Sequence, residues 1–251
     1  LTNLTFSEEI NFKSEEKKKN KILKIFILYS ILSFLIMIFL NLSGVRLFNS
    51  LNLAMTLISN GGFLPLDSLD KIITTNLQKI ILIVALIFSM LNFYLLINLF
   101  NQKVLFKEHK EDMYLIIMTL ILILLIYFNN YDGLNIIISV LSSLANSGIT
   151  LITTDKNLSL YFLFITIIGG SLISNSSGIK FCRFYILLKI TSSDIIKIIS
   201  PNSVINKTIF DSQNKITDEY IKISFLIFIS FFLSLFILSS FLVFDNIGFE
   251  N

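Results

Sequence analysis

The sequence of 251 residues has little charge, a single histidine and a single cysteine. Only 15% of its residues are charged, whereas a soluble domain carries roughly 25%. Cys182 has no partner in the chain, which excludes an internal disulfide framework. His109 lies among charged residues with no second histidine or cysteine near it, so we expect it in a solvated loop rather than at a metal. A hydrolytic triad would therefore lack a base in the apolar sequence, and no enzyme is predicted.

Hydrophobic residues make up 54% of the chain and gather in long runs. These runs cover residues 22–40, 80–100, 113–128, 158–173 and 221–244. About 20 apolar residues are needed to span a bilayer, so the runs predict membrane-spanning helices and an all-α membrane protein. The segment before the first run is polar, and the run itself is too long for the core of a signal peptide, so we interpret it as a spanning helix.

The basic residues are distributed unevenly along the chain. Of the 20 Lys and Arg residues, 16 lie in three segments, residues 13–24, 103–110 and 180–222. Basic segments next to membrane helices usually stay in the cytoplasm. We therefore predict a cytoplasmic N-terminus and five crossings, so that the chain finishes outside.

The two outer segments repeat one pattern. Residues 50–67 and 133–155 each contain an apolar stretch too short to span, then a Ser/Asn-Gly turn, one bulky apolar residue and a polar exit that ends in Asp. The pattern predicts a repeated unit of spanning helix, re-entrant pore helix, glycine turn and spanning helix.

Such a turn suits ion coordination, because extended backbone after a half-helix presents carbonyls that can replace a cation's hydration shell. Glycine permits the positive φ that this geometry needs. One glycine turn alone is more often an ordinary loop, but two copies in register favour a selectivity filter. The predicted cation-binding residues are Ser59, Asn60, Gly61, Gly62, Asn146, Ser147 and Gly148.

The fourth apolar run contains a polar break. Eight of the ten residues from 169 to 178 are glycine, serine or asparagine, which have low helix propensity. Irregular backbone at this depth is tolerated only where protein buries it or where it lines a water-filled cavity. Because glycine and serine offer little packing, we expect this segment to be a mobile gate. The predicted gate residues are Gly169, Gly170, Ser171, Ser174, Asn175, Ser176, Ser177, Gly178 and Lys180. Lys180 and Arg183 either anchor the helix at the cytoplasmic interface or project into the inner pore.

These motifs resemble the Trk/Ktr/HKT superfamily of potassium transporters, most closely the bacterial Trk membrane subunit. The matching stretches are Ser59-Asn60-Gly61-Gly62-Phe63 and Asn146-Ser147-Gly148-Ile149-Thr150, similar to the second and third filter segments, and Ile168-Gly169-Gly170 with residues 174–184, similar to the broken helix of the third repeat. Ser200-Pro201-Asn202-Ser203-Val204 further resembles the stretch that follows in that family.

The resemblance implies potassium uptake across the inner membrane, with K+ held by filter carbonyls and no other cofactor. It also implies a homodimer in the lipid bilayer, gated by a cytosolic ring of nucleotide-binding regulatory subunits, with no nucleic acid partner. A less selective Na+/K+ transporter and a non-conducting helical bundle remain the alternatives.

The repeats divide the chain, which we expect to be one membrane domain. Residues 22–100 form the second of four pore-loop repeats, and residues 113–197 form the third, with the broken helix. Residues 198–220 are a cytoplasmic linker, and residues 221–244 are the first helix of the fourth repeat. A filter of this type needs about four loops around one axis, so two loops predict an interior fragment of a pore.

Overall fold

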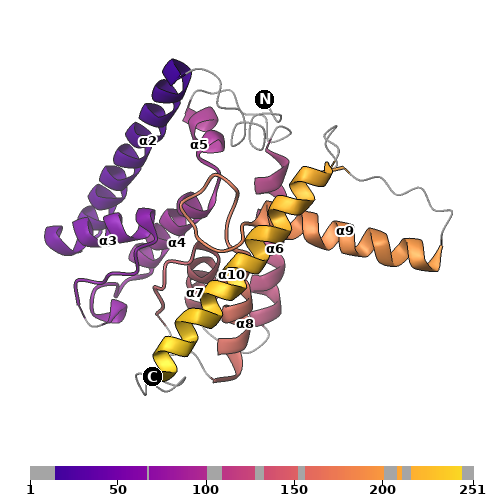
Figure 1. Ribbon diagram of the computed structural model, residues 1–251. Helices are drawn as coiled ribbons and strands as arrows, with labels where there is room; N and C mark the ends of the chain where they lie inside the picture. Colours follow the sequence, from indigo (N-terminus) through magenta and orange to yellow (C-terminus); the bar gives the residue numbers. More distant parts are fainter. Residues whose placement is uncertain are drawn as a thin grey trace. The chain divides into compact units, whose positions relative to one another are not determined.

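The predicted all-α membrane fold is confirmed by a computed structural model, which describes residues 15–66, 68–100, 109–127, 133–151, 156–200, 208–210 and 216–244. The elements in these ranges are helices (Figure 1). They are α2 (Glu15–Leu42), α3 (Leu47–Ser59), the 3-10 helix η1 (Leu69–Lys71), α4 (Asn76–Met90), α5 (Phe93–Phe100), α6 (Lys110–Tyr127), α7 (Gly133–Ala145), α8 (Lys156–Ile168), α9 (Phe181–Ile199) and α10 (Asp218–Phe244). Two compact units, Leu1–Phe181 and Cys182–Asn251, are each described by themselves.

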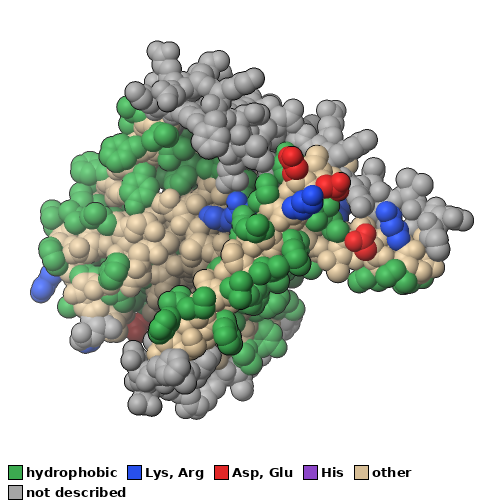
Figure 2. Space-filling view, viewed as in Figure 1, with side chains coloured by type: hydrophobic (Ala, Val, Ile, Leu, Met, Phe, Trp, Pro, Cys, Tyr) green, Lys and Arg blue, Asp and Glu red, His purple; other side chains and the backbone are tan. Residues whose placement is uncertain are grey.

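Two of the helices, α2 and α10, are built for contact with lipid. The segments Ile22–Leu42 and Asp218–Phe241 are long and apolar enough to cross a membrane. Many of their large side chains are exposed, and Figure 2 shows hydrophobic surface over α2 and along α10. Six serine hydroxyls within them donate to carbonyls three or four residues earlier, so these hydroxyls need no water. The serines are Ser30, Ser33, Ser230, Ser234, Ser239 and Ser240.

The spanning helix predicted over residues 80–100 is not one continuous helix. In the structure α4 ends at Met90, α5 begins at Phe93, and the two axes differ by 114°. Counted together, this bent pair would be a third span by length and composition among the described residues. The predicted run 158–173 is also shorter as a helix, because α8 ends at Ile168.

The short helices α3 and α7 have 13 residues each. At 1.5 Å per residue each is about 20 Å long, well short of a bilayer core of about 30 Å. Helix α7 contacts α4, α6 and α8, and its residues from Ile138 to Ala145 are all buried. Because protein surrounds its C-terminal half, α7 lies inside the first unit rather than against lipid.

Polar contacts join the helix ends that the charge pattern predicts to be outside. The amide of Gln78, in the first turn of α4, accepts from the amide N–H groups of Thr74 and Thr75 at 2.8 and 3.1 Å. Its Nε2 donates to the carbonyl of Ser43, just after α2, at 3.1 Å. Lys79 Nζ donates to Asn135 Oδ1, in the first turn of α7, at 2.9 Å. The end of α2 and the starts of α4 and α7 therefore lie together.

Candidate functional site

The chain leaves α3 and α7 through two turns of the same shape. Asn60 and Asn146 follow the helices with φ of 54° and 58°, and Gly62 and Gly148 adopt φ of 72° and 67°. Asparagine tolerates the left-handed conformation better than other residues with a side chain, and glycine adopts it without strain. Each turn thus alternates left-handed and ordinary residues, which reverses the backbone within four positions.

Each turn is tied back to the last turn of its helix. The amide of Gly61 donates to the Thr56 carbonyl at 3.1 Å, and the amide of Ser147 donates to the Ser142 carbonyl at 3.0 Å. These bonds satisfy carbonyls that a helix end leaves open. The corresponding residues of the two repeats therefore make the corresponding bonds.

The hydroxyls of the same two residues hold the position after the glycine. Thr56 Oγ1 donates to the Phe63 carbonyl at 2.7 Å. Ser142 Oγ accepts from the Ile149 amide at 3.0 Å and lies 2.8 Å from Ser147 Oγ. Both turns are fixed at each end, so the residues between the ends have a defined path.

The carbonyl oxygens inside the turns are left without donors. Among the described residues, no hydrogen bond reaches the carbonyls of 60–62 or 146–148. Gly62 and Gly148 are also exposed. Exposed carbonyls without a protein donor are open to water or to a cation.

The two turns lie against each other although more than 80 residues separate them in sequence. A Cβ atom added to Gly62 would stand 3.0 Å from the Ser147 carbonyl oxygen. A Cβ atom added to Gly148 would stand 4.0 Å from Gly62 Cα. The backbones therefore approach closely at Gly62, as turns lining one axis require.

The two asparagines differ in their side-chain contacts. Asn146 Nδ2 donates to the Thr166 carbonyl of α8 at 3.1 Å. Both polar atoms of the Asn60 amide are buried without a hydrogen-bond partner among the described residues. The second turn is therefore braced against α8, whereas the first is held by backbone and hydroxyl contacts.

The polar loop, residues 169–180, separates α8 from α9 and closes on itself. The amide of Ile179 donates to the Ile167 carbonyl at 3.0 Å, and the amide of Phe181 donates to the Gly170 carbonyl at 2.9 Å. A Cβ atom on Gly169 would lie 2.2 Å from the Ser177 carbonyl oxygen. Glycine is needed at this neck because two backbones touch there.

The expectation that this loop has little packing is wrong. The five consecutive residues 168–172 are all buried, and Ser176 and Ile179 are buried as well. The Gly170 amide donates to Ser176 Oγ at 2.9 Å. Ser174, Asn175 and Gly178 are half-buried, and Ser177 is exposed. Glycine and serine serve close approach and internal hydrogen bonds here rather than looseness.

The loop fills the break between α4 and α5. The Ser171 amide donates to the Met90 carbonyl at 3.0 Å, and the Phe93 amide donates to the Ile173 carbonyl at 2.9 Å. These bonds supply partners for groups that the end of α4 and the start of α5 would otherwise leave open. The break in the predicted helix therefore has its physical cause in a segment that follows it much later in the sequence.

The loop also touches the end of a pore helix. Asn175 Nδ2 donates to the Ile58 carbonyl of α3 at 2.6 Å. Ile58 precedes Ser59, the last residue of α3, and Asn60, the first residue of the turn. The polar loop and the first turn are thus direct neighbours.

The side chain of Lys180 is part of the loop's own hydrogen-bond network. Its φ is 77°, and its Nζ turns back into the loop, where it donates to the carbonyls of Ser174, at 3.0 Å, and Ser176. The hydroxyls of the same serines lie 3.3 and 3.4 Å from Nζ. The ammonium group therefore holds the loop together, a role that the sequence did not indicate. Arg183 is half-buried, as is the nearby Tyr185, and Cys182 is buried.

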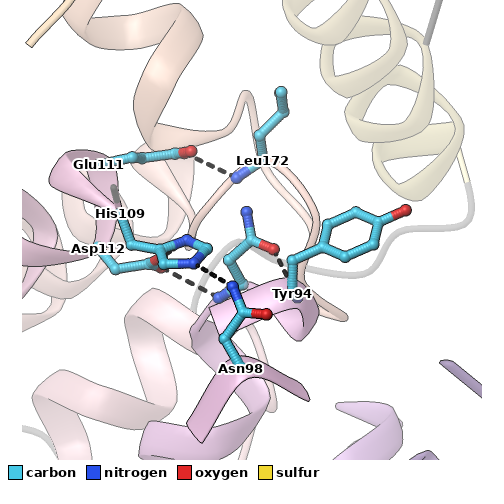
Figure 3. Close-up of polar contacts among 7 residues, drawn as sticks. Tyr94, Asn98, His109, Glu111, Asp112 and Leu172 are labelled. Atoms are coloured by element: carbon cyan, nitrogen blue, oxygen red, sulfur yellow. Dashed lines mark hydrogen bonds and ion pairs between the residues drawn. The ribbon is translucent and has the colours of Figure 1, made fainter. Parts of the chain in front are cut away.

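A polar cluster that the sequence did not indicate contacts the loop at Leu172 (Figure 3). Glu111 and Asp112, in the first turn of α6, accept from the amides of Leu172 and Asn92 at 2.7 and 3.0 Å. His109 Nε2 pairs with Asn98 Nδ2 at 3.0 Å, and its side chain is 13% exposed, so the expectation of a solvated histidine is wrong. The acidic pair looks ordinary in sequence, because carboxylates are common at helix N-termini.

Known proteins resemble the chain in sequence and in fold. No protein-family model matches the chain. A Methanocaldococcus jannaschii protein that is named an uncharacterized cation transporter is 28% identical over 238 residues, which are 91% of this chain and 47% of that protein. The crystal structure of the potassium transporter TrkH from Vibrio parahaemolyticus matches with a TM-score of 0.76 and 17% identity, over 94% of this chain and 54% of TrkH. The chain spans about half the length of either protein, and the fold that the resemblance implied is confirmed.

Proposed function

We propose that the protein transports cations across a membrane, and that K+ passes the two turns after α3 and α7. The observation that carries the proposal is the pair of matched turns, which have unpaired carbonyls and whose backbones approach each other closely at Gly62. Neutral carbonyl oxygens suit a monovalent cation, because they replace its hydration shell without the charge that would trap it. The names of the Methanocaldococcus and Vibrio proteins support the same function.

The polar loop is the gate of this pathway in our proposal. It lies at the end of α3 through the bond from Asn175 to Ile58, and it also fills the break between α4 and α5. An element that touches the filter on one side and a helix break on the other can couple the movement of one to the other. Gating by a loop of this kind requires two positions of similar free energy.

We further propose the inner membrane as location, with the N-terminus in the cytoplasm, on the basis of the 16 basic residues in three segments. A homodimer and a cytosolic ring of nucleotide-binding subunits are proposed from the resemblance alone. Native mass measurement of the detergent-extracted protein tests the first, since a monomer mass would contradict it. Co-purification with a nucleotide-binding subunit tests the second.

The central experiment expresses the protein from its whole gene in a bacterial host that lacks potassium uptake. Growth at low K+ and uptake of Rb+ as a K+ tracer are expected above the empty host, with Na+ uptake lower. Equal rates for Na+ and K+ would favour the less selective transporter. Absence of uptake, with the protein present in the membrane, would leave a non-conducting helical bundle and end the proposal.

For glycine substitutions in the two turns, the matched control is Gly133→Ala in the first position of α7. Among the described residues, a Cβ atom there would meet the Tyr127 ring alone, at 3.5 Å, which is ordinary contact. This variant should transport as the wild type does. It shows whether the assay responds to any glycine change in a pore helix or only to those in the turns.

A further inference from the structure

The first turn of α6 binds the polar loop and the α4–α5 break at once. Glu111 Oε1 accepts from the Leu172 amide at 2.7 Å, and Asp112 Oδ1 accepts from the Asn92 amide at 3.0 Å (Figure 3). Hydrogen bonds to an ionised carboxylate are stronger than those between neutral groups. Two adjacent side chains thus hold two separate backbone segments by their amides.

The two segments are also bonded to each other. The Ser171 amide and the Ile173 carbonyl, on either side of Leu172, bond Met90 and Phe93, on either side of the break. Three successive loop residues are therefore fixed by α4, α6 and α5 in turn. The part of the loop from 171 to 173 is its anchored side, and Asn175 reaches α3 from the opposite side.

An ordinary explanation exists for acidic residues at this position. Negative charges are favourable at a helix N-terminus, and α10 begins with Asp218 and Glu219 in the same way. Those two side chains are exposed, however, whereas Asp112 is 1% exposed and accepts an amide from another element. Helix stabilisation alone does not require a buried carboxylate that bonds a distant segment, since burial of a charge is costly.

The carboxylate pair also lies next to the predicted cytoplasmic connection between α5 and α6. His109 precedes α6 directly, and its ring pairs with Asn98 of α5 at 3.0 Å. His109 Nδ1 lies 3.9 Å from Asp112 Oδ2. A shift of the start of α6 against α5 therefore changes the contact that holds the loop.

We propose that Glu111 and Asp112 are positioning residues that keep the polar loop in the ion path, and that displacement of the start of α6 from the cytoplasmic side releases it. The inference rests on the proposed function, in which this loop is the gate. In this proposal the uptake rate is regulated by the contact between the first turn of α6 and the backbone amides of the loop. The selectivity of the two turns after α3 and α7 is not affected. Loss of the contact should raise the maximal uptake rate and leave the K+/Na+ ratio unchanged.

The test uses two variants of Glu111, one that changes the length of the side chain and one that changes its charge. Glu111→Asp keeps the negative charge at the helix N-terminus but shortens the side chain by one methylene, so it cannot reach the Leu172 amide. Glu111→Gln removes the charge but keeps an acceptor at the same reach. The proposal predicts a larger release in the Asp variant than in the Gln variant, which keeps a neutral and weaker acceptor for the Leu172 amide, whereas a helix-terminus role predicts the reverse order.

Loop release is measured without transport, by the labelling rate of Leu172→Cys with a membrane-permeant thiol reagent. Leu172 is 5% exposed, so labelling should be slow in the otherwise wild-type protein, and the protein that retains Leu172 gives the blank. Combined with Glu111→Asp, labelling should rise about tenfold, the equilibrium change that corresponds to one hydrogen bond of a charged group. Combined with Glu219→Ala, the matched carboxylate of α10, it should not change.

Uptake is measured in the same variants without the cysteine. Faster labelling together with a higher maximal uptake rate, an unchanged half-saturating K+ concentration and an unchanged K+/Na+ ratio would support the proposal. Unchanged labelling in Glu111→Asp, an equal rise in Glu219→Ala, or faster labelling with lower uptake would overturn it. A wild-type protein without uptake ends the proposed function instead, and the labelling result still decides whether the carboxylate pair holds the loop.

Discussion

The glycines of the two turns should differ in their tolerance of a side chain, and the difference follows from the space around them. Both have positive φ, so alanine at either position costs about 1–2 kcal/mol from backbone conformation alone. At Gly148 the nearest atom to the new Cβ is 4.0 Å away. At Gly62 the new Cβ stands 3.0 Å from the Ser147 carbonyl oxygen, which must move.

Gly148→Ala should therefore lower the K+/Na+ uptake ratio without preventing assembly. If the turn relieves its strain by moving its carbonyl, a cost of about 1–2 kcal/mol corresponds to a loss of discrimination of up to roughly 5- to 30-fold. Gly62→Ala should lower the ratio further, because its Cβ also displaces a carbonyl of the second turn. Gly148→Ser should behave as the alanine variant does.

Gly44 provides the matched control, because it also has positive φ, 96°, and belongs to the turn between α2 and α3. No atom of the described residues lies within 4 Å of the Cβ that alanine would add there. Gly44→Ala should lower stability by a similar amount and leave the ratio unchanged. The assay compares Rb+ and Na+ uptake in cells with equal amounts of membrane protein. A normally assembled Gly148→Ala with an unchanged ratio, or an equal fall in Gly44→Ala, would refute the reasoning.

Three further predictions concern the loop and the topology. Asn175→Ala removes the donor to the Ile58 carbonyl and should raise maximal uptake severalfold, since a neutral hydrogen bond contributes about 1 kcal/mol; uptake at the wild-type rate would contradict this. Lys180→Met leaves the loop carbonyls without their ammonium donor and should lower the amount of protein in the membrane more than Lys180→Arg does, as judged by immunoblot; equal amounts would show that the donor is dispensable. Single cysteines at Glu108 and Asp155, which lie outside the described residues, should label from opposite sides of the membrane, and labelling from one side would end the topology proposal.

The turns after α3 and α7 were accessible to sequence reasoning because their signals are local. A short apolar helix, an asparagine at its end and a glycine two positions later, as in Asn60 with Gly62 and Asn146 with Gly148, specify the backbone within a few residues. Repetition of the signal then indicates shared geometry. The matched hydrogen bonds of Thr56 and Ser142 follow from the same local register.

The break between α4 and α5 has only a weak signal in its own residues. Asn92 interrupts an apolar run and its side chain accepts from the Tyr94 amide at 2.9 Å, as a capping asparagine does, but neither glycine nor proline marks the site. The bonds that stabilise the break come from the polar loop, so the cause is tertiary. The same holds for Glu111 and Asp112, whose sequence context fits any helix start and whose partners lie in other segments.

The position of the Lys180 ammonium group has a consequence for how the protein responds to the ions around it. The ammonium group is covalently attached and lies among serine oxygens of the loop. The loop conformation should therefore depend little on which ions are in solution. The turns after α3 and α7 contain no such ammonium group, and in the proposed function their unpaired carbonyls are stabilised by a mobile cation instead. Depleting K+ should therefore loosen the turns and spare the loop, which amide hydrogen exchange of both segments at low and high K+ would show; equal loosening of the two would contradict it.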